Sequence, residues 1–186
     1  MANRFRQWRI DGIRLDRSER ECGLSSAGIT RFPQWADWTP TLLDELISKV
    51  PVNTRDTAMR AFITDPRDTA TPRATVELLK RTFSGELLSA SSTTRLIQIL
   101  ESTTTGGARL KGLLPPGTVV AHKTGTTGTE RGLNGGTNDV GVVTLPNNAG
   151  QFAIAVFIKG STGTTEIRER VIARIARSAF DAWSKS

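Results

Sequence analysis

The 186-residue sequence contains a single cysteine, Cys22, and a single histidine, His122. One cysteine cannot form an intramolecular disulfide, and the two side chains together are too few for a protein-only metal site. No apolar run reaches the roughly 20 residues that a transmembrane helix needs, and residues 1–9 lack the hydrophobic core of a signal peptide. We therefore expect no metal or other cofactor, no membrane insertion and no export signal in this chain.

Aromatic residues are also scarce, at 6%, and tyrosine is missing, but a hydrophobic content of 37% is enough for one domain with a modest core. The 18 acidic residues are outnumbered by 25 lysines and arginines, which gives a formal charge of +7 and a pI near 10.5. Such a balance raises nucleic acid as a partner. The arginines are interspersed with Glu and Asp, however, and match no nucleic-acid-binding motif. We expect no nucleic-acid partner, and a non-catalytic basic binding module remains an alternative.

The most informative stretch lies at residues 119–128 (VVAHKTGTTG), followed by residues 135–143 (GGTNDVGVV). Two apolar runs around a glycine-rich turn predict a β-hairpin. Its first strand ends in Lys123-Thr124-Gly125, a motif of class A β-lactamases and penicillin-binding proteins. Residues 113–117 precede this motif and Asn138-Asp139 follows it, in the order which that family has. The chain thus resembles the C-terminal part of a class A serine β-lactamase.

The resemblance assigns roles around the Lys-Thr-Gly motif. Opening a β-lactam ring needs an activated serine, a base, a cation for the substrate carboxylate and an oxyanion hole. Lys123 and Thr124 would recognise the carboxylate, and Lys123 would also act in catalysis. Gly125 would let the substrate approach the strand edge, and the backbone N–H of Thr126 would be one oxyanion donor. Arg109 stands where many class A enzymes keep an arginine that reaches this strand; an exposed arginine is the alternative.

Residues 17–19 (Arg-Ser-Glu) resemble the start of the family's Ω-loop, where a glutamate activates the deacylating water. The resemblance makes Glu19 the general base, although this chain has glycine where the family has the asparagine that helps to hold the water. A charged, solvated loop without chemistry is the alternative for Glu19. Residues 65–72 resemble the segment that closes the loop, which implies that Asp68 pairs with Arg17.

Residues 23–64 leave the family pattern. Within them, residues 41–50 have apolar side chains at helical spacing, and Pro51 is expected to end that helix. Family Ω-loops are much shorter, so we interpret residues 23–64 as an insertion in the Ω-loop region, beside the mouth of the active site. Since no reactive residues are suitably spaced in it, we interpret it as a surface decoration; a role in substrate choice is the alternative.

Four further elements complete the expected fold. Helices are predicted from Pro72 to about Ser84, over residues 89–101 and over residues 165–183, and a largely buried strand over residues 151–158. The last helix carries an apolar stripe that should lie across the sheet, formed by Ile167, Val171, Ile175, Ala179 and Trp183. The predicted fold class is α/β: an antiparallel sheet flanked by helices, of β-lactamase/transpeptidase type but incomplete, in a single domain over residues 1–186.

A nucleophile motif is missing, because no lysine has Ser or Thr three residues before it and no Ser-x-Asn occurs. Both motifs lie upstream of the Ω-loop in the family. We therefore expect a serine hydrolase that opens β-lactams through an acyl-enzyme, with the isolated chain inactive. Its expected partners are a β-lactam substrate and either a missing N-terminal half or a second copy. The full-length family member would be periplasmic or secreted; the alternative activity is that of a D-alanyl-D-alanine peptidase.

Overall fold

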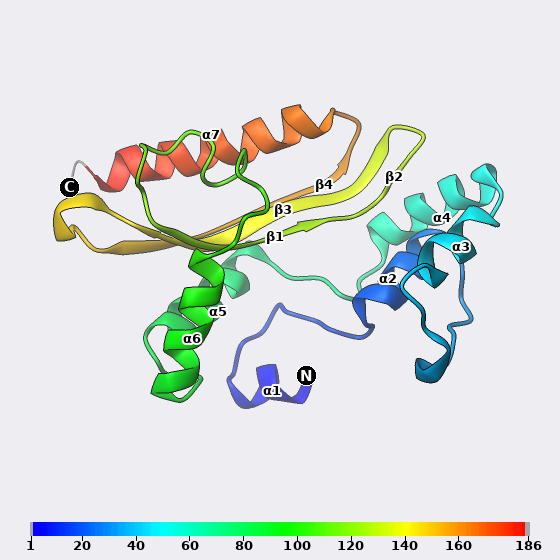
Figure 1. The fold of residues 1–186 in the computed structure, drawn as a ribbon, viewed down its shortest axis with the longest axis horizontal. Helices are drawn as coiled ribbons and strands as arrows, with labels where there is room; N and C mark the ends of the chain where they lie inside the picture. Colours follow the sequence, from blue (N-terminus) through cyan, green and yellow to red (C-terminus); the bar gives the residue numbers. More distant parts are fainter. Residues whose placement is uncertain (1, 185–186) are drawn as a thin grey trace.

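The computed structural model describes residues 2–184, which are built around an antiparallel sheet (Figure 1). Its strands are β1 (Val120–Thr126), β2 (Thr129–Glu130), β3 (Leu133–Thr144) and β4 (Gln151–Ser161). β3 is the middle strand, because it pairs with β1 and β2 on one side and with β4 on the other. In this register Lys123 lies opposite Val140, which lies opposite Ala155. The predicted hairpin and third strand are present, and the short β2 is an addition.

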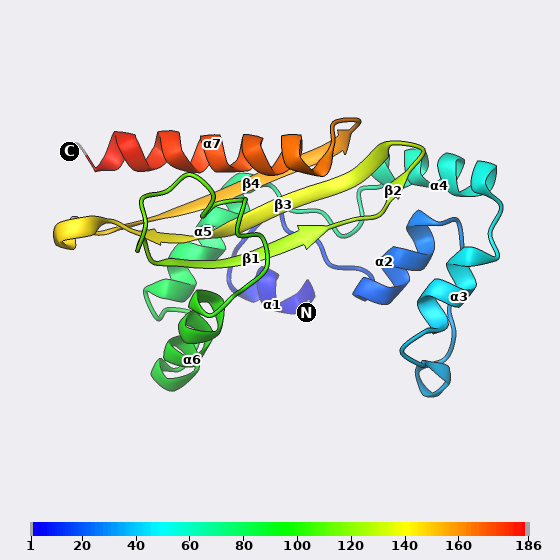
Figure 2. The same ribbon diagram turned by 45° about the horizontal axis from the view of Figure 1, so that its top comes forward.

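Helices cover both faces of the sheet: α7 (Thr165–Trp183) lies on one face, and α5 (Pro72–Phe83) and α6 (Ala90–Glu101) lie on the other (Figures 1 and 2). The main hydrophobic core fills the space between α7 and the sheet. β4 contributes every second residue to it, so the strand alternates between buried and partly exposed positions, whereas a largely buried strand was predicted. The core consists of Leu110, Val120, Val143, Leu145, Phe152, Ile154, Val156, Ile172, Ala176 and Phe180.

The bounds of α7 agree with the prediction, but the predicted buried face is wrong. Ile167, Val171 and Ile175 are 55%, 42% and 45% exposed, whereas the row one residue further along the helix is buried, beginning at Arg168. The Arg168 side chain donates to Thr137 Oγ1 at 2.9 Å and to two other oxygens in the connection before the helix and in its first turn. Since those acceptors satisfy the guanidinium, the row that begins with an arginine can face the sheet.

The helices α5 and α6 begin as predicted. Thr71 Oγ1 accepts the Ala74 N–H at 3.2 Å at the start of α5, with Pro72 in the first turn. Ser89 Oγ accepts the Ser92 N–H at 3.3 Å at the start of α6. Both helices therefore begin with a side-chain cap.

Four more helices precede α5: α1 (Ala2–Gln7), α2 (Glu19–Ser26), α3 (Leu42–Ser48) and α4 (Val52–Thr64). Single turns of 3₁₀-helix occur at Trp35–Asp37 and Pro146–Asn148. α3 was predicted, whereas the others were not, and α2 to α4 gather beyond the end of the sheet where β1 passes into β2 (Figures 1 and 2). Over residues 2–184, no helix combines the length and the apolar character that crossing a membrane requires.

Backbone hydrogen bonds join the two ends of the region that contains α2, α3 and α4. Ile13 and Ala70 form an antiparallel bridge, the Arg14 N–H donates to Thr69 O, and the Thr71 N–H donates to Gly12 O, both at 2.8 Å. The segment between them therefore begins and ends at the same place in the fold, where residues 12–14 pair with residues 69–71.

Candidate active site

Strand β1 carries the Lys-Thr-Gly motif from the interior to the surface. Val120, Ala121 and His122 are buried, whereas Lys123 is exposed and its ammonium group donates to Thr124 O at 2.5 Å. The Thr124 hydroxyl lies 2.8 Å from the hydroxyl of Thr105. The strand end therefore presents one cation and a fixed hydroxyl to the surface.

The Arg109 side chain lies against this strand end and is buried, with the residue only 6% exposed, so the exposed alternative for Arg109 is wrong. Its Nη2 donates to Thr126 Oγ1 at 2.7 Å, and its Nη1 donates to Gly125 O at 3.1 Å and to Asn138 O at 2.9 Å. Nε donates to a Glu169 carboxylate oxygen at 3.1 Å. Such a planar, fully engaged guanidinium fixes the strand end.

His122, which precedes Lys123 on β1, forms a buried pair with Asp139 of β3. Both side chains are fully buried, and His122 Nδ1 is 2.9 Å from Asp139 Oδ1. Asp139 Oδ2 also accepts the Leu110 N–H at 3.2 Å. Gly141 is the cross-strand partner of His122, and its lack of a side chain makes space for the His122 side chain. A Cβ at position 141 would lie 2.8 Å from the His122 Cβ. The pair ties β1 and β3 to the segment that carries Arg109.

Arg17 and Asp68 lie in contact at the two ends of the 15–68 segment. Arg17 Nε is 2.6 Å from Asp68 Oδ2, and the Arg17 and Asp16 N–H groups donate to Asp68 Oδ1 at 2.8 and 2.6 Å. Burial by itself would raise the pKa of Asp68, but these donors outweigh burial and hold that pKa below its ordinary value. Arg17 Nη2 also lies 3.3 Å from Asp65 Oδ2.

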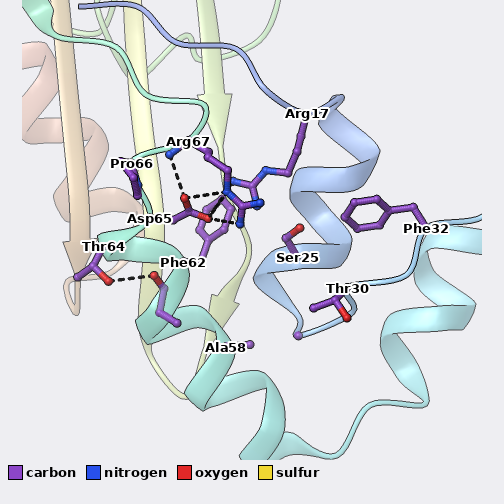
Figure 3. Close-up of a pocket in the computed structure, with 12 residues that line it drawn as sticks. Arg17, Ser25, Thr30, Phe32, Ala58, Phe62, Thr64, Asp65, Pro66 and Arg67 are labelled. Atoms are coloured by element: carbon purple, nitrogen blue, oxygen red, sulfur yellow. Dashed lines mark hydrogen bonds and ion pairs between the residues drawn. The ribbon is translucent and has the colours of Figure 1, made fainter.

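Figure 3 shows Arg17 reaching from the start of α2 toward Asp65, over the ring of Phe62 at the end of α4. These groups line a cavity of about 480 Å³ between α2 and α4, whose other walls include Ser25 and Phe32. None of the residues that line it belongs to β1. The Arg17 contacts therefore hold two helices and the closing loop together.

Glu19 lies exposed in the first turn of α2, a helix that was not predicted. Ser18 and Glu21 form a capping box there, a signal that the sequence carries in its Ser-x-x-Glu spacing. Glu19 lines a second cavity of about 490 Å³ together with Trp35 and Trp38. Within the part of the chain that the structure describes, no hydrogen bond joins Glu19 to β1. The structure thus brings Arg109 together with the Lys-Thr-Gly strand but leaves Glu19 apart.

Comparison with known proteins gives a consistent result. The model of the Beta-lactamase enzyme family matches residues 14–183. The β-lactamase VEB-1 of Pseudomonas aeruginosa is 47% identical over 114 residues, which are 60% of this chain and 38% of that protein. The carbapenem-hydrolyzing β-lactamase KPC of Klebsiella oxytoca is 31% identical over 159 residues, 83% of this chain and 48% of that protein.

Among solved structures, the TLA-1 extended spectrum β-lactamase superposes with a TM-score of 0.73 at 33% identity, covering 98% of this chain and 53% of that one. A β-lactamase from Chitinophaga pinensis gives a TM-score of 0.70 at 32% identity, with 97% and 53% covered. The chain spans about half the length of these proteins, and less of VEB-1.

Proposed function

The chain belongs to the Beta-lactamase enzyme family, and we propose that it supplies the Lys-Thr-Gly side of a serine β-lactamase site. Lys123 and Thr124 bind the carboxylate of the β-lactam, and Gly125 lets the substrate lie close to the strand. The backbone N–H of Thr126 serves as an oxyanion donor. Glu19 remains our candidate for the base that activates water, on the resemblance of residues 17–19.

The observation that carries this proposal is the contact of Arg109 with the end of β1. Arg109 fixes the strand end while its own charge is paired with Glu169, so the exposed Lys123 is the cation that favours a carboxylate there. Within the described residues β1 is an edge strand, so alternate backbone groups point away from β3 and can pair with a substrate amide.

We propose that the nucleophile comes from a part of the full-length protein outside these residues. The sequence has neither Ser-x-x-Lys nor Ser-x-Asn, and the chain spans 53% of the TLA-1 structure. Without the activated serine of such a motif, the isolated chain is expected to form no acyl-enzyme. The full-length enzyme would act in the periplasm or outside the cell.

Two alternatives have less support. A D-alanyl-D-alanine peptidase would share the Lys-Thr-Gly motif, but the Arg17–Asp68 contact favours the lactamase. A nucleic-acid-binding module would need free arginines, whereas Arg17, Arg55 and Arg109 have carboxylate partners within the chain.

The proposal is tested by Lys123→Ala in the full-length protein, with Lys80→Ala on the exposed face of α5 as the matched control. We expect the Lys123 variant to lose about 100-fold or more in kcat/KM for nitrocefin, as when one preorganised electrostatic group is removed. The Lys80 variant should stay within about twofold, since surface changes away from the site have small effects. A Lys123 variant with unchanged kcat/KM would overturn the assignment.

A further inference from the structure

The cavity between α2 and α4 has a volume of about 480 Å³, which is the size of a site for a small molecule. Figure 3 shows the Arg17 guanidinium at one end of this cavity and Ala58 of α4 at the other, with the rings of Phe62 and Phe32 on opposite sides. Gly28, which also lines the cavity, is exposed to solvent. A small molecule can therefore enter from that side.

Arg17 contributes a hydrogen-bond donor that has no acceptor. The side chain is only 6% exposed; its Nε donates to Asp68 Oδ2 at 2.6 Å, and its Nη2 lies 3.3 Å from Asp65 Oδ2. The third nitrogen, Nη1, is buried and has no hydrogen-bond partner in the part of the chain that the structure describes. A buried donor without an acceptor costs free energy, which an oxygen atom brought by a ligand would recover.

The charges at this end of the cavity indicate that the oxygen belongs to a neutral group. Arg17 faces Asp65 and Asp68, and Arg67 pairs with Asp65 at 2.6 Å. The Arg67 side chain donates to Asp65 and holds the pKa of that carboxyl far below its ordinary value. Two carboxylates thus balance two guanidinium groups. A ligand carboxylate would lose its hydration beside two charges of its own sign, whereas a carbonyl oxygen would not.

The walls of the cavity suit an aromatic body. Phe62 lies under the Arg17 guanidinium, whose carbon is 5.5 Å from the ring centroid, and Phe32 lies across the cavity from it. Aromatic rings pack favourably against such side chains. Ser25 also lines the cavity, and its hydroxyl can accept a hydrogen bond from a ligand N–H. An aromatic amide matches each of these groups.

We propose that the cavity between α2 and α4 is a binding site for a small, neutral aromatic amide or ketone. The carbonyl oxygen of the ligand accepts from Arg17 Nη1, and its ring lies between Phe32 and Phe62. The inference does not depend on the proposed function, because none of the residues that line the cavity belongs to the Lys-Thr-Gly strand. It gives part of residues 23–64 a role in binding instead of surface decoration.

The test titrates benzamide into the ¹⁵N-labelled 186-residue chain and follows two signals, the backbone amide of Gly28 and the side-chain Nε–H of Arg17. Benzoate is titrated in parallel, because it has nearly the same size and shape but carries a negative charge. Two variants change the cavity: Ala58→Leu fills it, and Phe32→Ala removes one of its rings. The matched control is Thr57→Leu, at an exposed position of the same helix that does not line this cavity.

We expect benzamide to shift both signals in a saturable manner with a Kd of about 1 mM or lower, as a ligand of this size can reach. Benzoate should bind at least about tenfold more weakly, because it must lose its hydration without a free cation to pair with. Ala58→Leu should weaken benzamide binding about tenfold by overfilling the site. Phe32→Ala should weaken it about fivefold through lost apolar contact, and Thr57→Leu should leave it within about twofold.

The absence of a saturable shift at Gly28 and Arg17 in the unmodified chain would overturn the site. Saturable binding of equal strength in the unmodified chain and in Phe32→Ala would place the ligand elsewhere and would also overturn it; this variant decides the matter if circular dichroism shows that Ala58→Leu does not fold. Benzoate binding as tightly as benzamide would overturn the assignment to a neutral ligand.

Discussion

At the scale of single residues, the Asp68 carboxylate accepts hydrogen bonds from the Arg17 side chain and from the N–H groups of Asp16 and Arg17. Its folded-state pKa is lower than the ordinary value of about 3.9 for an unfolded chain. The contribution of Asp68 to stability is therefore present above about pH 4 and is lost as the pH falls through the lowered pKa.

We predict that Asp68→Asn lowers the free energy of unfolding by roughly 2 kcal/mol at pH 7, as expected for lost hydrogen bonds to a charged group. The difference from the unmodified chain should shrink as the pH is lowered from about 5 to 3. Urea unfolding followed by circular dichroism at several pH values measures both. The control is Asp44→Asn, which changes an exposed carboxylate on α3. If the loss in free energy of unfolding caused by Asp68→Asn did not vary with pH, the account would be contradicted.

The His122–Asp139 pair leads to a second prediction. Asp139→Ala leaves His122 Nδ1 and the Leu110 N–H without their acceptor in the interior. Each buried unpaired group costs about 1–3 kcal/mol, so we expect a loss of roughly 3 kcal/mol in the free energy of unfolding. Asp181→Ala removes an exposed carboxylate on α7 and should cost about 0.5 kcal/mol or less. Equal losses in the two variants would argue against a structural role for the pair.

At the scale of elements, sequence periodicity determined where α7 begins and ends but not which way it faces. Two apolar rows lie side by side on this helix, and the row with Ile172, Ala176 and Phe180 is the one that packs on the sheet. The choice depends on acceptors for Arg168 that lie outside the helix, including Thr137 of β3. No pattern within residues 165–183 contains that information.

The exposed row of α7 predicts self-association. Ile167, Val171 and Ile175 form an apolar stripe at helical spacing on the outer face, and such stripes on isolated domains favour association. We expect the chain to form dimers or larger species at high concentration in sedimentation equilibrium, and Ile175→Lys to shift it toward monomer. Arg174→Ala, also exposed, should not. A monomeric unmodified chain would refute this prediction.

The helices α2 and α4 escaped prediction for different reasons. α2 has a capping box that its sequence shows, but the charged residues around Glu19 give no apolar periodicity that would indicate a helix. α4 follows Pro51, and a proline at this position is compatible both with the end of α3 and with the start of a new helix. The position of α4 against β2 depends on Arg55 and Glu130, 75 positions apart, and such a contact leaves no local signal.

At the scale of the whole molecule, the motif order predicted the sheet, the hairpin and the family. The starts of α5 and α6 could be predicted, because the caps that fix them, at Thr71 and Ser89, are local interactions. The burial of Arg109 was undecided from sequence, since an arginine is buried only where tertiary acceptors exist, here on two strands and α7. Local rules thus predicted the elements, and long-range polar contacts determined how they meet.

The most direct test of the central claim is nitrocefin hydrolysis by the purified 186-residue chain, with mass spectrometry for a penicillin adduct. We predict no adduct and at most weak residual turnover in the isolated chain, because binding and oxyanion groups act without a nucleophile. The full-length protein should hydrolyse nitrocefin and carry the adduct on a serine outside this chain. Rapid turnover by the isolated chain together with a covalent adduct on one of its own serines would contradict the account.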